Sequence, residues 1–319
     1  METVLVTGGA GFIGSHLIRR LLEDNRFVVC LDNFNDYYDP QIKRRNVKSV
    51  SGNKNYSLAE GDIRDVKFLD TIFDKFEFTK VVHLAAMAGV RNSILKPALY
   101  ADVNLTGTVN LLEKTRQAGI KTFVFGSTSS VYGSNKKIPF SESDPIEGVI
   151  SPYAATKFAC EEMCKAYHNL FGMGICCLRF FTVYGPAGRP DMAIYKFTDA
   201  IYNGREIEMY GDGTSRRDYT YVDDIVQGIR SAMDRNWKLE IINLGESQTT
   251  ELRQMIAMIE QALGKEAKIK RLPMQQGDVM ATYADISKAK RLLDYKPSFP
   301  LQKGIERTIK WYLEQISLR

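Results

Sequence analysis

The sequence is poor in the residues that bind metals or build disulfide frameworks. It has five cysteines and three histidines among 319 residues. The cysteines are odd in number and show no framework spacing, which favours free thiols in a reducing compartment, and we expect a cytoplasmic protein. Cys160 and Cys164 lie four residues apart on an expected helix, but no further ligands cluster with them. We therefore expect a buried helix face there, and no metal site.

Long hydrophobic runs are also missing. No segment approaches the roughly 18–20 apolar residues that a membrane-spanning helix needs. The first residues, 1–7, carry an acid and only a short apolar run, so no signal peptide is expected there. Charge of one sign is not in large excess, since 43 Lys and Arg against 38 Asp and Glu give a formal net charge of +5. This charge is too weak to favour nucleic acid, and small anionic ligands fit it at least as well.

Short apolar runs alternate with helical patterns over the first 180 residues. The runs occupy 4–6, 27–31, 80–84, 122–125 and 175–178, and the helical patterns lie near 12–24, 65–76, 98–118 and 153–170. Continuous apolar runs are typical of strands that are buried on both faces. The alternation predicts an α/β fold with a doubly wound parallel sheet of the Rossmann type.

The rhythm changes after residue 181, where prolines and glycines separate shorter elements. Helices are expected near 222–234, 249–263, 287–293 and 302–316. We predict a nucleotide-binding domain over 1–181, with a return segment at about 219–246. A smaller α/β domain over 182–319 would bind the substrate.

A glycine-rich turn between the first strand and the first helix predicts a dinucleotide site. Gly8, Gly11 and Gly14 have G-x-x-G-x-x-G spacing, which lets backbone N–H groups approach a pyrophosphate at the helix N-terminus. Asp32 ends the next strand, 18 residues after Gly14. A carboxylate there accepts hydrogen bonds from the ribose hydroxyls and repels a 2′-phosphate, so we expect NAD as the cofactor, not NADP.

Other residues are expected around the same cofactor. Asp62 and Ile63, after a third strand, would flank the adenine. Lys43, Arg44 and Arg45 could favour a phosphate, but we interpret them as a solvated helix face. The remaining expected cofactor residues are Phe12, Ile13, Asn33, Leu84, Ala85 and Ala86.

A second pattern, SPYAATK at 151–157, indicates catalytic chemistry. Ser151 as N-cap and Pro152 at the first helical position start a helix on which Tyr153 and Lys157 share a face. A phenol has a pKa near ~10, so action as a base near neutrality requires a shift of about three units, or ~4 kcal/mol. A neighbouring ammonium, the helix N-terminus and a cationic nicotinamide favour the phenolate. Thr128, at the end of a core strand, can hydrogen-bond the Tyr153 oxygen and a substrate hydroxyl.

The chain resembles the extended short-chain dehydrogenase/reductases over nearly its whole length. The motifs that carry the resemblance are TGGAGFIGSHL, HLAA, STSSVYG, SPYAATK, RFFTVYGP, RRDYTYVDD and QGDVMATYADISKA. Within this family the chain is most similar to the UDP-sugar 4-epimerases that act on UDP-glucuronic acid. That narrower likeness rests on DNFNDYYDP, AGVRNSI, RFFTVYGPAGRPDMA and PMQQGD.

The resemblance implies a catalytic triad of Thr128, Tyr153 and Lys157, with Tyr153 as the base. Both Tyr153 and Lys157 would also contact NAD, which stays bound throughout. The sugar 4-hydroxyl would be oxidised, the 4-keto sugar would turn over in the pocket, and reduction on the opposite face would give the epimer. UDP-glucuronic acid would thus be converted reversibly to UDP-galacturonic acid.

The resemblance also implies which residues contact the sugar. Related 4,6-dehydratases have Asp-Glu after the catalytic Thr, and UDP-glucuronate decarboxylases have Ser-Glu, whereas Ser129 and Ser130 stand here. Hexose epimerases usually have Asn at the position of Thr182. These three hydroxyls suit a sugar carboxylate, and Arg189 is implied near the same pocket.

For the nucleotide, Arg217 matches the diphosphate-binding arginine of the family, and Asp278 matches its uridine ribose ligand. Tyr210 is expected beside the uracil. One departure is Gln275, where hexose epimerases have an arginine. A phosphate contact would then come from elsewhere, either from Arg91 or from another group, with Arg91 in solvent as the alternative.

Other functions remain open at this point. A UDP-glucose or UDP-N-acetylhexosamine 4-epimerase would share every catalytic residue. A UDP-glucuronate decarboxylase, an ordinary dehydrogenase that releases NADH and a non-catalytic NAD-binding protein are further alternatives. The resemblance also implies a homodimer, formed through a four-helix bundle of the helices near 98–118 and 153–170.

Overall fold

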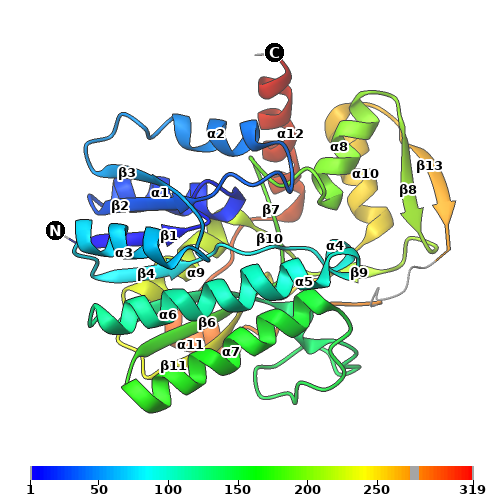
Figure 1. Ribbon diagram of the computed structural model, residues 1–319. Helices are drawn as coiled ribbons and strands as arrows, with labels where there is room; N and C mark the ends of the chain where they lie inside the picture. Colours follow the sequence, from blue (N-terminus) through cyan, green and yellow to red (C-terminus); the bar gives the residue numbers. More distant parts are fainter. Residues whose placement is uncertain (1, 274–279, 318–319) are drawn as a thin grey trace.

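A seven-stranded parallel sheet forms the centre of the molecule, as seen in the computed structural model, which describes residues 2–273 and 280–317 (Figure 1). Its strand order is β11-β6-β5-β4-β1-β2-β3. The strands are β1 (Thr3–Thr7), β2 (Phe27–Asp32), β3 (Tyr56–Glu60), β4 (Lys80–His83), β5 (Thr122–Thr128), β6 (Gly174–Phe180) and β11 (Leu239–Leu244). The predicted doubly wound α/β fold is therefore confirmed.

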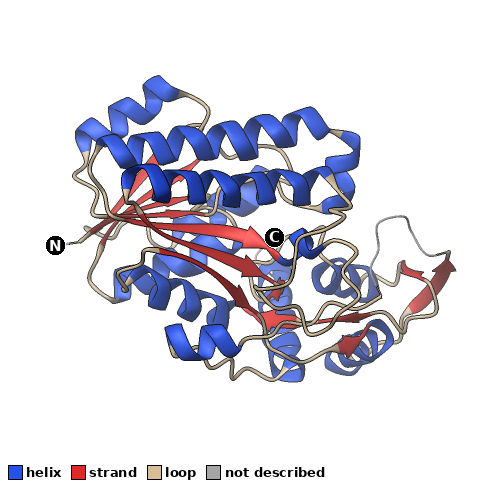
Figure 2. Cartoon of the chain, turned by 90° about the horizontal axis from the view of Figure 1, so that it is seen from below, coloured by secondary structure: helices blue, strands red, loops and turns tan. Residues whose placement is uncertain are grey.

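Helices cover both faces of this sheet (Figure 2). One layer contains α3 (Val66–Lys75), α6 (Gly107–Gln117) and α7 (Pro152–Phe171), and the other contains α1 (Phe12–Glu23), α9 (Val222–Met233) and α11 (Ser287–Leu293). Alternate strand residues enter the two cores: Leu5 packs with the first layer, and Val4 and Val6 with the second. This alternation follows from the two-residue period of a strand that is buried on both faces.

The helix expected near 98–118 is not uniform. It consists of α5 (Pro97–Tyr100), a π-helical segment (Ala101–Thr106) and α6. Asn104, inside the π-helical segment, accepts a hydrogen bond from the Met87 backbone N–H at 2.7 Å and donates one to the Met87 carbonyl at 3.0 Å. Single π turns inside α-helices are frequent at functional sites.

Shorter elements form the smaller part of the molecule beside the carboxyl ends of the strands. They comprise α4 (Val90–Leu95), β7 (Thr182–Tyr184), α8 (Ala193–Tyr202), β8 (Glu206–Tyr210), β9 (Arg216–Arg217), β10 (Tyr219–Tyr221), β12 (Thr250–Glu251), α10 (Leu252–Leu263), β13 (Lys268–Leu272) and α12 (Leu301–Ser317). Helix α2 (Pro40–Lys48) instead connects β2 to β3 and packs against α1. β8 pairs with β13, β7 with β10, and β9 with β12. The boundaries at residues 181 and 182 stay a prediction. Within the expected return segment, β11 pairs with β6, and α9 packs against α1.

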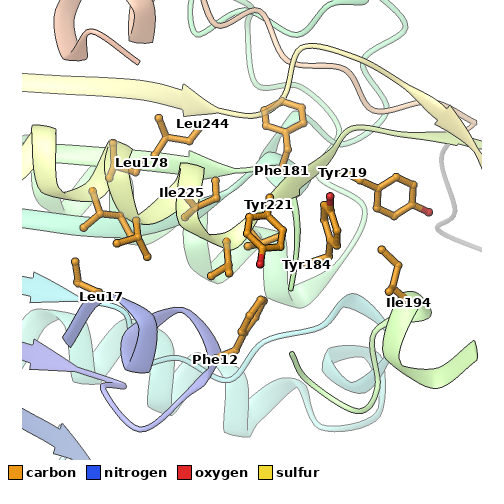
Figure 3. Packing of buried hydrophobic residues seen from close by; sticks show 14 of the residues in the cluster. Phe12, Leu17, Leu178, Phe181, Tyr184, Ile194, Tyr219, Tyr221, Ile225 and Leu244 are labelled. Atoms are coloured by element: carbon orange, nitrogen blue, oxygen red, sulfur yellow. The ribbon is translucent and has the colours of Figure 1, made fainter. Parts of the chain in front are cut away.

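Aromatic side chains continue the core from the sheet into this smaller part. Phe12, Phe181, Tyr184, Tyr219 and Tyr221 lie in one buried cluster (Figure 3). The same cluster includes sheet residues on one side and α8 residues on the other. A single apolar core therefore joins the two parts of the chain.

Three further observations concern residues 2–273 and 280–317. All five cysteines are buried and free, Cys160 and Cys164 among them. In these described ranges no group of three or more His, Cys, Asp or Glu side chains is arranged to hold a metal ion. No described helix is long and apolar enough to cross a membrane.

Three carboxyl groups interact electrostatically, since the charges of Asp218 and Asp224 act on Glu246. Asp218 is 0% exposed and accepts hydrogen bonds from the backbone N–H groups of Glu246, Ser247 and Ala284. Burial raises the pKa of Asp218 to about 6. Burial, with the charges of Asp224 and Asp218, raises the pKa of Glu246 to about 7. The Oε2 atom of Glu246 has no hydrogen-bond partner among the described residues.

We expect Glu246→Gln to stabilise the fold at alkaline pH. Folded Glu246 keeps its proton up to about pH 7, whereas an unfolded glutamate releases it near ~4.3. Its contribution to stability is therefore complete below the unfolded pKa and is lost as the pH rises through the folded pKa. Glutamine stays neutral, so the Tm of the variant should exceed the wild-type Tm at pH 8, with the gap narrowing towards pH 5. The exposed Glu314→Gln is the control, and an equal gap at both pH values would contradict the account.

Candidate active site

Two adjoining cavities open at the carboxyl ends of the sheet strands. The first has a volume of 410 Å³ and is lined by Gly8, Gly11 and Gly14; we call it the glycine-loop cavity. The second, of 640 Å³, is the arginine cavity, since Arg91, Arg189 and Arg217 line it. Ligands of open parallel sheets bind at this edge.

The structure brings the predicted cofactor residues together around the glycine-loop cavity. Its lining includes all of them: Gly8, Gly11, Phe12, Ile13, Gly14, Asp32, Asn33, Asp62, Ile63, Leu84, Ala85, Ala86, Tyr153 and Lys157. They come from the ends of four different strands and from the starts of α1 and α7. Their contact with a cofactor stays a prediction.

Two glycines of the loop cannot be replaced without strain. Gly8 has a φ of +66°, in the left-handed region. A Cβ on Gly14 would lie 2.3 Å from the Gly8 carbonyl oxygen and 2.7 Å from the Gly9 Cα. The missing side chains leave a backbone cradle at the N-terminus of α1, which suits a pyrophosphate.

Asp32 is held at the end of β2 by backbone N–H groups. Its carboxylate oxygens accept hydrogen bonds from Ala10 N at 3.2 Å and Phe34 N at 2.9 Å. Burial raises the pKa of Asp32, while the cations of Lys43 and Arg44 lower it. The carboxylate thus faces the cavity in a fixed orientation, as a ribose ligand would require.

The expectation that Lys43 lies on a solvated helix face is wrong. Lys43 is only 5% exposed, and its Nζ donates hydrogen bonds to the carbonyl oxygen and Oδ1 of Asn35, at 3.1 and 3.0 Å. Its Nζ lies 3.9 Å from an Asp32 oxygen. The loop before α2 folds back over the helix start and covers this lysine. Arg44 and Arg45 are exposed, as expected.

Helix capping places Tyr153 and Lys157 at the cavity. The Ser151 side chain accepts a hydrogen bond from Ala154 N at 3.1 Å, and Pro152 occupies the first turn of α7. Burial raises the pKa of Tyr153, while a hydrogen bond from Thr128 and the positive charge of Arg189 lower it. Thr128 ends β5 and lines the same cavity. The predicted triad is therefore assembled in space.

Lys157 is almost completely buried beside this tyrosine. It is 3% exposed, and its Nζ lies 4.1 Å from the centre of the Phe125 ring. Burial lowers the pKa of Lys157, and the Glu161 carboxylate is among the groups that raise it. Lys157 follows Tyr153 by one helical turn of α7, and an ammonium close to a phenol favours its phenolate form.

Asn104 ties the first turn of α7 to the π-helical segment. Its Nδ2 donates to Thr156 Oγ1 at 3.0 Å, and Thr156 Oγ1 donates to the Tyr153 carbonyl at 2.8 Å. The sequence does not predict this contact. Asn104 lies 52 positions from Thr156, so no local pattern connects them.

The predicted substrate residues line the cavities on the sugar side. Ser129, Ser130, Thr182 and Arg189 line both cavities, whereas Arg91, Tyr210 and Arg217 line the arginine cavity. Thr128 completes the set in the glycine-loop cavity. Asp278 and Gln275 lie outside the described residues. Arg91 is exposed, and its guanidinium carbon lies 4.8 Å from the centre of the Tyr210 ring.

Arg189 is fixed by contacts that the sequence did not reveal. Asp191 accepts from Arg189 Nε at 3.0 Å and Nη2 at 2.6 Å, and it also accepts from the Tyr37 hydroxyl at 3.2 Å. Asn92 Nδ2 donates to the same hydroxyl at 2.9 Å. A Cβ on Gly89 would lie 2.6 Å from that oxygen, so glycine leaves the room for Tyr37. The motif DNFNDYYDP contains Tyr37, but nothing in the sequence pairs it with Asp191.

The arrangement supports one type of chemistry. A phenol with a nearby ammonium and threonine hydroxyl can take a proton from an alcohol. The adjacent glycine-loop cavity would hold a hydride acceptor beside it. The arginine side chains in the arginine cavity suit phosphate groups on the molecule that carries the alcohol.

Known proteins are similar to this chain in both sequence and fold. The sequence model of the family described as GDP-mannose 4,6 dehydratase matches residues 5–308. The chain is 43% identical over 319 residues to UDP-glucuronate 4-epimerase of Thermodesulfobacterium geofontis, covering 100% of this chain and 98% of the relative.

Two solved structures are similar over nearly the whole chain. The crystal structure of UDP-glucuronic acid 4-epimerase from Bacillus cereus, in complex with UDP-glucuronic acid and NAD, has a TM-score of 0.90 and 36% identity, covering 98% of this chain and 99% of that one. UDP-glucose 4-epimerase of Thermotoga maritima, with UDP-glucose, has a TM-score of 0.91 and 33% identity, with the same coverage.

Proposed function

The chain belongs to the extended short-chain dehydrogenase/reductase family, in which the GDP-mannose 4,6-dehydratase model matches it, and we propose that it is the NAD-dependent epimerase that interconverts UDP-glucuronic acid and UDP-galacturonic acid at C4. The observation that carries the proposal is the presence of Thr128, Tyr153 and Lys157 together in the lining of the glycine-loop cavity. Relatives and solved structures named for this activity support the substrate.

The residues fit NAD by their shape and charge. The cradle at Gly14 has no room for a side chain, and Asp32, in the lining of the same cavity, would accept hydrogen bonds from a ribose diol. When bound, NAD⁺ accepts a hydride from the sugar and returns it. Lys157 would hydrogen-bond the nicotinamide ribose, and its charge would stabilise the Tyr153 phenolate.

Tyr153 moves the proton in both halves of the reaction. Its phenolate takes the proton of the sugar 4-hydroxyl as the C4 hydride leaves, which gives a 4-keto sugar. Thr128 would donate a hydrogen bond to the oxygen at C4 of the sugar. After the ketone turns in the cavity, Tyr153 gives the proton back to the alkoxide that forms on reduction. Arg217 and Arg91 hold the diphosphate during the turn.

Hydroxyl groups determine what happens to the uronate. Oxidation at C4 makes a β-keto acid, which loses CO₂ when its carboxylate stands perpendicular to the ketone plane. Ser129, Ser130 and Thr182 line both cavities and would hold the carboxylate away from that geometry. Arg189, fixed by Asp191, would close over it.

We expect Thr182→Ala to divert part of the flux from epimerisation to decarboxylation. The lost hydrogen bond, about 1 kcal/mol in a typical case, frees the carboxylate to rotate after C4 oxidation. UDP-4-keto-pentose and CO₂ should appear, and UDP-galacturonic acid should form more slowly. Released CO₂ and nucleotide products are measured together. Thr198→Ser, buried in α8 away from both cavities, is the control. No pentose product from the Thr182 variant would count against this role.

Product analysis with separate substrates tests the proposal itself. The purified protein is incubated with UDP-glucuronic acid, UDP-glucose or UDP-N-acetylglucosamine, and products are resolved by chromatography. We expect UDP-galacturonic acid from the first and little change in the others. Turnover of a neutral sugar alone would make the chain a hexose epimerase, and accumulation of free NADH would make it a dehydrogenase.

The same proposal includes a homodimer. Helices α6 and α7 pack side by side (Figure 1), and the end of α7 leaves Leu170 72% exposed. Pairing these helices with a second copy would give a four-helix bundle. Light scattering should report twice the chain mass. A cytoplasmic location stays a prediction.

A further inference from the structure

A row of buried polar residues crosses the sheet behind the proposed catalytic side chains. Ser127, Arg179 and Asn243 are direct partners on β5, β6 and β11. Glu161 joins them from α7. Glu161 is 0% exposed and Arg179 is 2% exposed. None of these four residues is among those that the sequence predicts for the site.

Glu161 binds the strands on one side of the row. Its Oε1 accepts hydrogen bonds from Ser127 Oγ at 2.6 Å and Arg179 Nε at 3.0 Å, and its Oε2 accepts from Arg179 Nη2 at 2.7 Å. Ser127 directly precedes Thr128. Glu161 lies four residues after Lys157, on the buried face of the same helix. One carboxylate therefore connects the strand end that carries Thr128 to the helix that carries Lys157.

Arg179 extends the network to the other side. Its guanidinium carbon lies 4.8 Å from the centre of the Tyr132 ring, and the Tyr132 hydroxyl donates to Asn243 Oδ1 at 2.7 Å. Asn243 Nδ2 then donates to the carbonyl oxygens of Phe140 at 2.9 Å and Asp285 at 3.3 Å. The segments that contain Phe140 and Asp285, both outside the sheet, are thus hydrogen-bonded to the end of β11.

Stability alone is a poor reason for this network. A buried ion pair loses the hydration of both charges, and apolar residues of similar volume often serve as well or better. The Nη1 atom of Arg179 is buried without a hydrogen-bond partner among the described residues, which adds a further cost. Three contacts of fixed direction on one carboxylate do, however, fix relative positions more closely than apolar packing would.

We propose that Glu161 and Arg179 are positioning residues, which set the distance between Thr128 and the Tyr153–Lys157 pair. The inference rests on the proposed function, since it assigns the network to that reaction. A misplacement of about 1 Å in such a site can cost on the order of a hundredfold in rate. The network would set the geometry for proton and hydride transfer at C4. Its loss should therefore lower kcat far more than it changes KM.

The test compares three variants with the wild type. Glu161→Gln keeps the shape but removes the charge. The double variant Glu161→Met with Arg179→Met removes both charges without leaving one unpaired. Asp224→Asn is the matched control: it neutralises a carboxylate that accepts backbone hydrogen bonds from Ser298 and Phe299, outside both cavities. For each protein, kcat, KM, Tm and the pH profile of kcat are measured.

We expect Glu161→Gln to lower kcat at least tenfold, with KM within about twofold. Loss of the carboxylate that raises the pKa of Lys157 should also move the alkaline limb of kcat to lower pH. The double variant should recover the wild-type Tm and keep the low kcat. Asp224→Asn should leave kcat and its pH profile unchanged.

Two results would overturn the inference: a folded Glu161→Gln with wild-type kcat and pH profile, or a double variant that regains full kcat together with Tm. Should Glu161→Gln not fold, Ser127→Ala cuts only the link to the Thr128 strand, and unchanged kcat there also overturns it. The wild-type assay decides the proposed function separately. A wild type that turns over no UDP-sugar would refute that function, a result distinct from an active wild type with fully active variants.

Discussion

Replacing Tyr153 with phenylalanine should lower kcat by about a thousandfold while leaving the binding of NAD and the UDP-sugar nearly intact. The hydroxyl is the group that takes and returns the proton of the sugar 4-hydroxyl. Burial raises the pKa of this hydroxyl, and the Thr128 hydrogen bond and the Arg189 charge act against that rise. Phenylalanine keeps the ring, including its edge contact with Tyr100 at 6.2 Å, so the cavity retains its shape. Turnover of UDP-glucuronic acid and ligand titrations measure the two effects.

A tyrosine outside the site provides the control. Tyr312→Phe in α12 loses a hydrogen bond to Asp199 at 2.6 Å but touches neither cavity. It should keep kcat and lose a little stability, about 1 kcal/mol. If Tyr153→Phe retained a kcat within tenfold of the wild type, another group would have to act as the base.

Gly14→Ala should weaken NAD binding by about 10- to 100-fold, or about 1–3 kcal/mol. The new methyl carbon would lie 2.3 Å from the Gly8 carbonyl oxygen, so the glycine loop must move away from the start of α1. The backbone cradle for the pyrophosphate is then lost. Calorimetric titration with NAD⁺ measures the affinity, and circular dichroism confirms that the sheet remains folded.

Gly52→Ala is the matched substitution. A Cβ at Gly52 meets nothing within 4 Å, and this residue is exposed. Its affinity for NAD⁺ should equal that of the wild type. Equal affinities in the two variants would show that the loop at Gly14 does not hold the cofactor.

Local patterns were enough to predict the centre of the site. The glycine spacing at Gly8 to Gly14 and the helix start at Ser151 involve residues within one or two turns of one another. Their geometry follows from the backbone requirements of a strand–turn–helix and from capping. The same holds for the buried strands β1, β2, β4, β5 and β6, whose continuous apolar runs reflect burial on both faces.

Tertiary contacts account for what the sequence did not reveal. Tyr37 and Asp191 meet across 154 positions, and Ser127 and Glu161 across 34. Lys43 stands beside Arg44 and Arg45, which misleadingly indicated a solvated face. Only the fold of the loop before α2 shows that Lys43 is covered. Charge patterns report helix faces, but they do not report which loop packs on them.

The position of β3 at the edge of the sheet explains why its sequence shows no continuous apolar run. β3 lies at the edge of the sheet, and four of its five residues are partly or fully exposed. Its sequence YSLAE mixes polar and apolar residues, as is common where one side of a strand has no neighbour. A strand is expected before Asp62, but hydrophobicity alone does not locate it.

The fate of the hydrogen on C4 tests the central claim most directly. The protein is incubated with UDP-glucuronic acid that carries deuterium at C4, in ordinary water and without external NADH. Removal and return of one hydride by bound NAD predicts UDP-galacturonic acid that retains its deuterium at C4. Product that has lost this deuterium to solvent would contradict transient oxidation at C4.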